Sequence, residues 1–183
     1  KLVGRDETFA AIKEFLSPAE SKRDLPHRKR VLLIVGNAGV GKSALAVELI
    51  ERRLKEFNCH LLAHFMCSTS APTTLSVSHF VQALSKQARK HLPQTNSKDS
   101  VDFKARRATT ASAAAIAEAS SGADIVKAFV AGFLTPLKEL DAGAHPARSC
   151  IVVDSLDESL EFLRATTRER MSIAELVFHP DVI

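Results

Sequence analysis

The stretch that most constrains the fold is GNAGVGKS, Gly36–Ser43, which directly follows the apolar run VLLIV at Val31–Val35. It satisfies every fixed position of the pattern G-x-x-x-x-G-K-[ST]. Glycines at this spacing let the backbone curl until successive N–H groups surround an anion. A helix is predicted from Lys42 onward, and its N-terminal end adds positive potential at the same place. The order strand, glycine loop, helix therefore predicts a site for the phosphates of a nucleoside triphosphate.

Individual residues of this loop have predicted roles. The Lys42 side chain is long enough to reach the β- and γ-phosphates, and the Ser43 hydroxyl is a ligand that suits Mg²⁺. Backbone groups supply the other contacts. The predicted nucleotide-binding residues are Gly36, Asn37, Ala38, Gly39, Val40, Gly41, Lys42, Ser43 and Ala44.

An acidic stretch near the end of the chain, IVVDSLDES, follows a predicted strand at Cys150–Val153. Clustered carboxylates resist burial unless a cation lies close to them. In a parallel sheet, ligands gather where the strands end, so Asp154 would lie near the glycine loop. We therefore expect Asp154 to hold the Mg²⁺ that Ser43 also contacts, usually through water.

Two further acids follow on the same stretch. Glu158 is the first choice, and Asp157 the second, for a carboxylate that orients or deprotonates the water attacking the γ-phosphate. The alternative is a structural role, in which one of them caps the next helix or pairs with an arginine. The residues alone leave both interpretations open.

The rest of the chain alternates between strand and helix patterns, which predicts an α/β fold with a parallel sheet covered on both faces. The helix after the loop places Leu45, Leu49 and Arg52 at turn spacing. The first helix has Asp6 as its expected cap. Strands are expected at 31–35, 59–67 and 150–153, and helices near 6–16, 42–57, 76–92, 105–123, 124–140 and 171–178. The loop strand and the acidic strand are thus not consecutive, as in the branch of P-loop proteins that includes AAA+ proteins and signalling ATPases.

Bulk properties exclude several other classes of protein. A formal charge of +4 over 183 residues does not by itself indicate nucleic-acid binding. Three cysteines without a C-x-x-C spacing argue against a disulfide framework and against a zinc site, and they fit the reducing cytoplasm. His60 and His64 could share one strand face, but no acid or cysteine completes a ligand set. No apolar run is long enough to span a bilayer.

Three segments together resemble a known family. LVGRDE at Leu2–Glu7, GNAGVGKS and IVVDSLDES are similar to the STAND class of P-loop NTPases and, within it, to the NACHT family. The NACHT acidic strand has four hydrophobic residues, Asp, a small residue, any residue and two acids. Cys150–Glu158 fits this pattern, with Ser155 as the small residue. HLLAHFMCSTS also resembles the second strand of NACHT modules in large repeat proteins.

The resemblance implies a three-layer P-loop core with strand order 5-1-4-3-2, which ends here after the acidic (Walker B) strand. Residues 1–183 would be the N-terminal part of one NACHT-like domain, with a lead-in helix and loop at 1–30 and an incomplete nucleotide-binding core at 31–183. Val3, Gly4 and Arg5 would contact the base. Such proteins bind ATP or ADP with Mg²⁺, hydrolyse ATP slowly, act as switches on other domains of their own chain, and oligomerise with ATP bound.

Two other functions remain open at this stage. One is an AAA+ or origin-recognition-like ATPase that turns over quickly on nucleic acid or protein. AAA+ proteins usually place Glu directly after the strand-end Asp, whereas Ser155 stands there in this chain. The other is an inert nucleotide-binding scaffold, which the intact Lys42, Ser43, Asp154 and Glu158 argue against.

Overall fold

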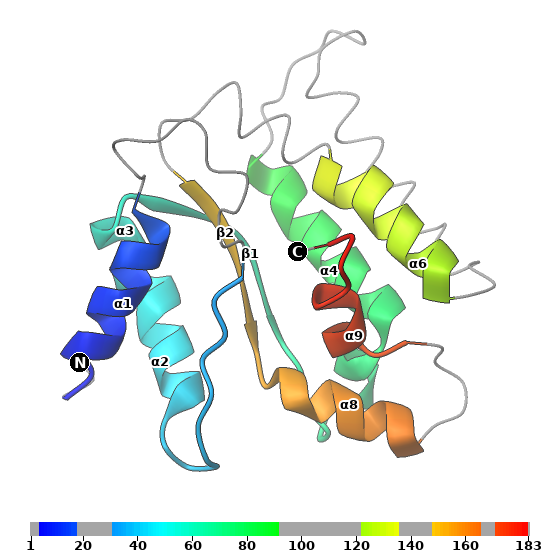
Figure 1. The fold of residues 1–183 in the computed structure, drawn as a ribbon, viewed down its shortest axis with the longest axis horizontal. Coiled ribbons are helices and arrows are strands. Elements are labelled where there is room, and N and C mark those ends of the chain that lie inside the picture. Colours follow the sequence, from blue (N-terminus) through cyan, green and yellow to red (C-terminus); the bar gives the residue numbers. More distant parts are fainter. Residues whose placement is uncertain (1–3, 18–30, 92–121, 136–147, 166–170, 183) are drawn as a thin grey trace, which may run out of the picture.

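A computed structural model of the chain describes residues 4–17, 31–91, 122–135, 148–165 and 171–182. Its described residues form a parallel two-stranded sheet with helices on both sides (Figure 1). The strands are β1 (Cys59–Met66) and β2 (Arg148–Asp154). The helical elements are α1 (Asp6–Leu16), α2 (Lys42–Glu48), the π-helical η1 (Leu49–Arg53), α3 (Leu54–Glu56), the 3₁₀ turn η2 (Pro72–Leu75), α4 (Val77–His91), α6 (Gly122–Phe129), the π-helical η3 (Val130–Leu134), α8 (Leu156–Ala165) and α9 (Ile173–Val177).

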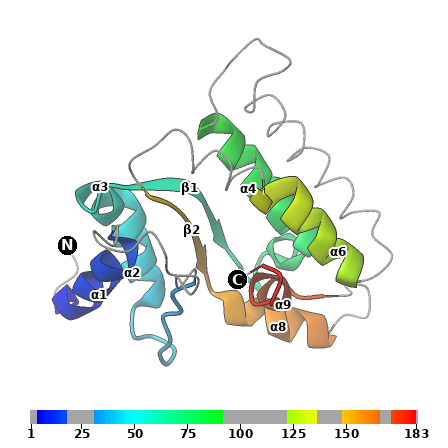
Figure 2. The same ribbon diagram turned by 45° about the horizontal axis from the view of Figure 1, so that its top comes forward.

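Side chains from the two faces of the sheet enter two separate hydrophobic clusters. One cluster joins the sheet to α1 and to the continuous helical run α2–η1–α3 (residues 42–56), called the α2–α3 run below. The other cluster joins the sheet to α4, α6 and α9 (Figure 2). The first face carries Cys59, Leu61, Cys150 and Val152, and the second carries Ala63, Phe65, Ile151 and Val153. Helices on both faces of a parallel sheet are the arrangement that the alternating sequence predicts, and this part of the fold is confirmed.

A bulge in β1 explains why the alternation changes along the strand. Leu61 pairs with Cys150 but Ala63 pairs with Ile151, so one extra residue of β1 faces a continuous β2. An extra residue reverses which face the following side chains occupy. Leu61 and Ala63 therefore enter opposite clusters, although they are two residues apart. The bulge also lies between His60 and His64, so simple alternation no longer places both on one face.

The largest cluster is built by the helices that the sequence predicts best. The expected stripe of α4 is confirmed, because Val77, Phe80, Val81 and Leu84 are all buried. Phe80 packs edge-on against Phe65 of β1, with ring centroids 5.1 Å apart. Phe129 and Phe133 stack at 5.2 Å on the other side of the cluster. Aromatic pairs at such distances add about 0.5–1.5 kcal/mol each beyond their area burial.

The α2–α3 run differs from the prediction by a single π turn. Leu45 and Leu49 are buried as expected, but Arg52 is 54% exposed and Leu54 is buried in its place. The π-helical η1 lies between Leu49 and Leu54 and widens the turn, so that five residues instead of four bring the next side chain to the same face. Residue spacing alone predicts an ordinary turn here. The prediction that Arg52 continues the stripe of Leu45 and Leu49 is therefore corrected, and Leu54 takes that place.

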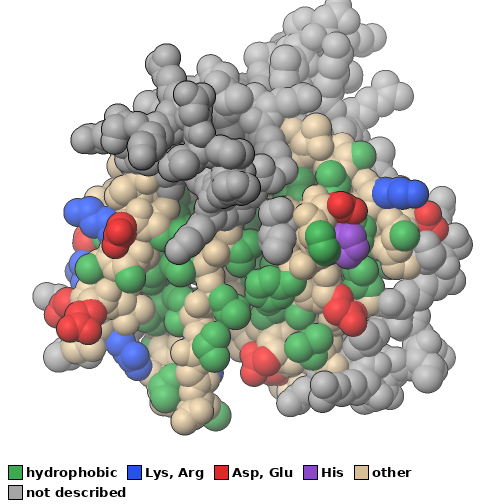
Figure 3. All heavy atoms as spheres, viewed as in Figure 1, with side chains coloured by type: hydrophobic (Ala, Val, Ile, Leu, Met, Phe, Trp, Pro, Cys, Tyr) green, Lys and Arg blue, Asp and Glu red, His purple; other side chains and the backbone are tan. Residues whose placement is uncertain are grey.

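The apolar segment before the glycine loop is not a strand, and this corrects the sequence-based prediction. Residues 31–37 are irregular and pair with neither β1 nor β2. Their side chains are exposed, from 37% at Val31 to 81% at Val35. A central parallel strand needs a hydrogen-bonded neighbour and a cover on each face. The described residues supply no neighbour for this backbone, and the space-filling view shows hydrophobic side chains gathered across the middle of this face (Figure 3).

The other predicted elements have mixed outcomes. β1, β2, α1 and α9 lie within a few residues of their expected places. Asp6 is not a cap, because it is the first residue of α1 and Arg5 precedes the helix without a side-chain bond. Most of the helix expected at 105–123 lies outside the described residues, and Pro136 also lies outside them. Pairing of β1 with β2 establishes one neighbour relation, while the full order 5-1-4-3-2 stays a prediction. No helix in the described part is long and apolar enough to cross a membrane.

Candidate nucleotide-binding site

The glycine loop has the curled backbone that its sequence predicts. Gly39 and Gly41 have φ values of +80° and +86°, in the left-handed region that side chains with a Cβ rarely adopt. At Gly36, an added Cβ would lie 3.0 Å from a methyl group of Val40, because the loop turns back on itself. α2 begins immediately after Gly41. The first N–H groups of a helix have no acceptor within it, so these donors are available to an anion.

Lys42 lies over this loop in the present structure. Its ammonium group donates hydrogen bonds to the carbonyl oxygens of Gly36, at 2.7 Å, and Asn37, at 3.1 Å. Both bonds are exposed, so water can satisfy the two carbonyl oxygens when the ammonium group moves to another acceptor. A phosphate can therefore take the place of the two carbonyls at small cost. The curled backbone and the cation above it fit a polyphosphate.

The segment before α1 also reaches the loop. The Arg5 guanidinium donates a hydrogen bond to the Val40 carbonyl oxygen. Gly4 has a φ of +74°, which turns the chain into α1. α1 is held on the α2–α3 run by the Arg53 guanidinium, which lies 4.8 Å from the centre of the Phe9 ring. The structure thus brings Arg5 to the nucleotide loop, while Val3 lies outside the described residues.

The acidic stretch occupies the carboxyl end of the sheet. Asp154 is the last residue of β2, and its carbonyl oxygen accepts a hydrogen bond of 3.1 Å from the Cys67 N–H. Ser155 has a left-handed φ of +54°, which turns the chain sharply into α8. Asp157 and Glu158 therefore lie on the first turn of α8, where the positive end of the helix dipole stabilises acidic side chains.

Glu158 has a partner that the sequence does not reveal. Its carboxylate accepts a hydrogen bond from the Thr69 N–H, in the loop that follows β1. Asp157 is exposed, whereas Glu158 is partly buried. The only sequence signal for this contact is a run of small hydroxyl residues directly after β1, at Ser68–Ser70.

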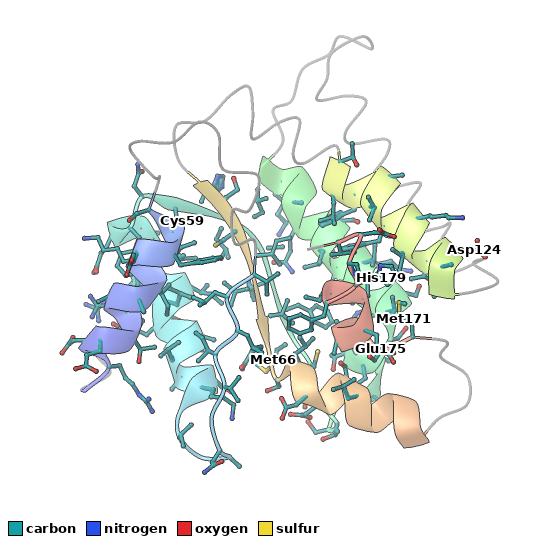
Figure 4. All side chains as sticks on the ribbon, viewed as in Figure 1. Cys59, Met66, Asp124, Met171, Glu175 and His179 are labelled. Atoms are coloured by element: carbon teal, nitrogen blue, oxygen red, sulfur yellow. The ribbon has the colours of Figure 1, made fainter. Side chains whose placement is uncertain are left out.

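The three acids have one neighbour in common, the buried thiol of Cys67. Burial first, and then the negative charges of Glu158, Asp154 and Asp157 in that order, together raise the pKa of the Cys67 thiol from 9.0 to about 12. All three carboxylates therefore act on a single sulfur atom at the end of β1. Figure 4 labels Met66, the neighbour of this cysteine, at the carboxyl end of β1 near the start of α8, and Cys59 at the opposite end of the strand.

The glycine loop and the acids lie on neighbouring elements. α2 packs beside β2, and both ribbon views place the loop at the edge of the molecule where β2 ends (Figures 1 and 2). Ser43 is exposed on the first turn of α2. A hydroxyl and a carboxylate are oxygen ligands, which Mg²⁺ prefers. Among the described residues no three His, Cys, Asp or Glu side chains form a metal site by themselves, so an ion held by Ser43 and Asp154 would also need phosphate and water oxygens.

Cys67 provides a test of this buried environment flanked by acids. We expect its alkylation by iodoacetamide at pH 7, in nucleotide-free protein, to be at least about 1,000-fold slower than that of an ordinary thiol, because the thiolate fraction falls tenfold per pKa unit. Labelled peptides are quantified by mass spectrometry, with the urea-unfolded protein as control. Because the folded-state pKa is raised, this thiol stabilises the fold below pH 9 and loses that contribution as pH rises toward 12. Rapid labelling in the folded protein at pH 7 would contradict this environment.

Comparison with protein-family models decides the family. The model described as the AAA ATPase domain matches residues 1–178. The chain belongs to the AAA ATPase domain family. Neither the curated proteins nor the solved structures that were searched contain a match. The AAA ATPase domain is a P-loop NTPase with an α/β fold and acts as a nucleotide-binding ATPase module, typically with Mg²⁺. NACHT and STAND membership is a finer statement than this match makes.

Proposed function

We propose that this AAA ATPase domain is the ATP/ADP-binding module of a regulatory switch of the STAND and NACHT type, with slow Mg²⁺-dependent ATP hydrolysis. It would act within a larger cytoplasmic signalling or scaffold protein. Its partners would be the nucleotide, other domains of the same chain and, with ATP bound, further copies of the protein, but not nucleic acid.

The observation that carries this proposal is the position of Glu158. Ser155 takes the place directly after Asp154 where AAA+ proteins usually have glutamate. Glu158 instead lies on the first turn of α8, and the Thr69 N–H already holds its carboxylate. The acid that would act on the attacking water thus stands on a helix four positions after Asp154, and not at the strand end next to it. This departure from the usual AAA+ arrangement supports the proposal that hydrolysis is slow.

The site residues keep the roles that the sequence predicts for them. Bound Mg²⁺ would neutralise charge that develops on the phosphates, with Ser43 and Asp154 as its protein ligands. Lys42 would bind the β- and γ-phosphates, and Glu158 would orient or deprotonate the attacking water, with Asp157 as the second choice. The base would lie near Val3, Gly4 and Arg5, and the phosphates on Gly36, Asn37, Ala38, Gly39, Val40, Gly41, Lys42, Ser43 and Ala44.

The second candidate is a motor or loader ATPase of the AAA+ or origin-recognition type, which the AAA ATPase family match favours. Turnover by the intact protein separates the two. A switch is expected to release far less than about one phosphate per second, the low end of typical enzymes, and to retain ADP through gel filtration. Turnover at or above that rate, with ADP released freely, would replace the switch with the motor.

A further inference from the structure

The loop after β1 is held by the Thr74 hydroxyl together with two backbone hydrogen bonds, from the Ala71 N–H to the Ser68 carbonyl oxygen at 3.0 Å and from the Thr74 N–H to the Ala71 carbonyl oxygen at 2.8 Å. The Thr74 hydroxyl accepts a hydrogen bond of 2.9 Å from the Ser68 N–H, and its oxygen lies 2.7 Å from the Ala71 carbonyl oxygen, to which it donates. The Ser68 carbonyl oxygen lies farther away, at 3.2 Å. The hydroxyl therefore connects the start of the loop to its middle and its end.

Backbone contacts anchor both ends of this loop. At its start, the Cys67 N–H is bonded to Asp154 of β2. At its end, Leu75 is 2% exposed, and the η2 turn that contains it packs beside α8. Between these anchors the Thr69 N–H faces α8 and donates to Glu158. The direction of that N–H thus depends on how the chain closes between Ser68 and Thr74.

We propose that Thr74 is a positioning residue for Glu158. Its hydroxyl fixes the loop between Ser68 and Thr74 in the shape that aims the Thr69 N–H at the Glu158 carboxylate, and so determines where that carboxylate stands relative to the attacking water. This inference rests on the proposed role of Glu158 in hydrolysis. The Thr74 hydroxyl bonds within the loop, so it would act on Glu158 only through the loop.

Matched substitutions separate the hydroxyl from the shape of the side chain. Thr74→Val keeps the branched shape but removes both hydrogen bonds, and Thr74→Ser keeps the hydroxyl. Ser70→Ala removes a different hydroxyl of the same loop, which lies 2.8 Å from the Ser68 hydroxyl. It serves as the control for nonspecific loosening, because Ser70 is exposed and makes no bond to Thr74 in the described structure.

The experiment measures kcat and KM for ATP, together with the Kd for a fluorescent ADP analogue, in the intact protein. We expect Thr74→Val to lower kcat roughly tenfold with KM and Kd unchanged, because a misplacement of about 1 Å can cost about 10²-fold and the loop keeps its backbone hydrogen bonds. Thr74→Ser and Ser70→Ala should stay within about twofold of wild type. Wild-type turnover in Thr74→Val, or equal losses in Thr74→Val and Thr74→Ser, would overturn the inference.

A double-mutant cycle tests whether the effect passes through Glu158. In single-turnover measurements Thr74→Val should have no further effect once Glu158→Gln is present, and an undiminished tenfold loss would overturn the inference. Wild-type turnover in Glu158→Gln would instead remove the proposed role of Glu158, and with it the reason for positioning. Should Thr74→Val not fold, a second variant, Thr69→Pro, removes the N–H group that donates to Glu158, at an exposed position. It should lower kcat with Kd unchanged. Unchanged kcat in that variant would overturn the inference equally.

Discussion

Replacing Lys42 with alanine is expected to abolish nucleotide retention, with the affinity for ATP and ADP falling roughly 30- to 1,000-fold. The ammonium group of Lys42 is the cation that the structure places over the curled loop. Without it, the phosphates keep the backbone N–H groups but lose their charged partner. Calorimetric titration of the intact protein with each nucleotide measures the loss.

The control for this variant is Lys55→Ala, which removes the same charge from an exposed position in α3. It should bind nucleotide as wild type does. The bonds that Lys42 makes are exposed, so its removal should leave the thermal unfolding temperature nearly unchanged and exclude misfolding as the cause. Nucleotide retention by Lys42→Ala at the wild-type level would show that the phosphates do not bind to this loop.

Glu158→Gln is expected to leave nucleotide affinity intact and to lower the rate of hydrolysis by about 10²–10⁴-fold, the usual contribution of a general base. The glutamine amide oxygen can still accept the hydrogen bond from the Thr69 N–H, so the loop after β1 keeps its shape. What the variant loses is a carboxylate that can take a proton. Phosphate release over hours, measured with radiolabelled ATP, records the change.

Asp157→Asn is the paired variant, because Asp157 lies beside Glu158 on the first turn of α8 but is exposed. It should hydrolyse ATP at close to the wild-type rate. If Asp157→Asn stops hydrolysis and Glu158→Gln does not, the two acids exchange roles. Equal and small effects in both variants would mean that neither carboxylate activates the water.

The sequence predicts best those elements whose burial follows a simple period. β2 and the buried stripe of α4 lie where the spacing of apolar residues places them, because each packs a regular face against the core. The departures occur where one extra residue enters an element. The bulge after Leu61 and the π turn after Leu49 each shift the period, and no residue type marks either of them in advance.

The segment Val31–Val35 shows a different limit. Its β-branched and apolar composition predicts a buried strand, but composition does not say which backbone will pair with it. The described residues offer it no partner, and the five side chains remain exposed. Local composition therefore indicates a tendency, while pairing depends on chain segments that are distant in the sequence.

The same difference between local and long-range features applies to the candidate site. The curl of the glycine loop could be predicted because its residues are contiguous and glycine permits the left-handed φ values found there. The contacts of Arg5 with Val40 and of Thr69 with Glu158 join residues separated by 35 and 89 positions. Spacing rules reach only a few residues along the chain, so these two contacts required the folded structure.

The two attachments of α1 limit how the amino-terminal helix can move. Arg5 is bonded to Val40 at one end of the α2–α3 run, and Phe9 lies against Arg53 near the other end. A body that is held at two separate points cannot pivot about either of them alone. Any rearrangement that lifts Val40 away must therefore break the Arg5 bond or carry α1 along, and the orientation of α1 becomes an external indicator of the state of the binding loop.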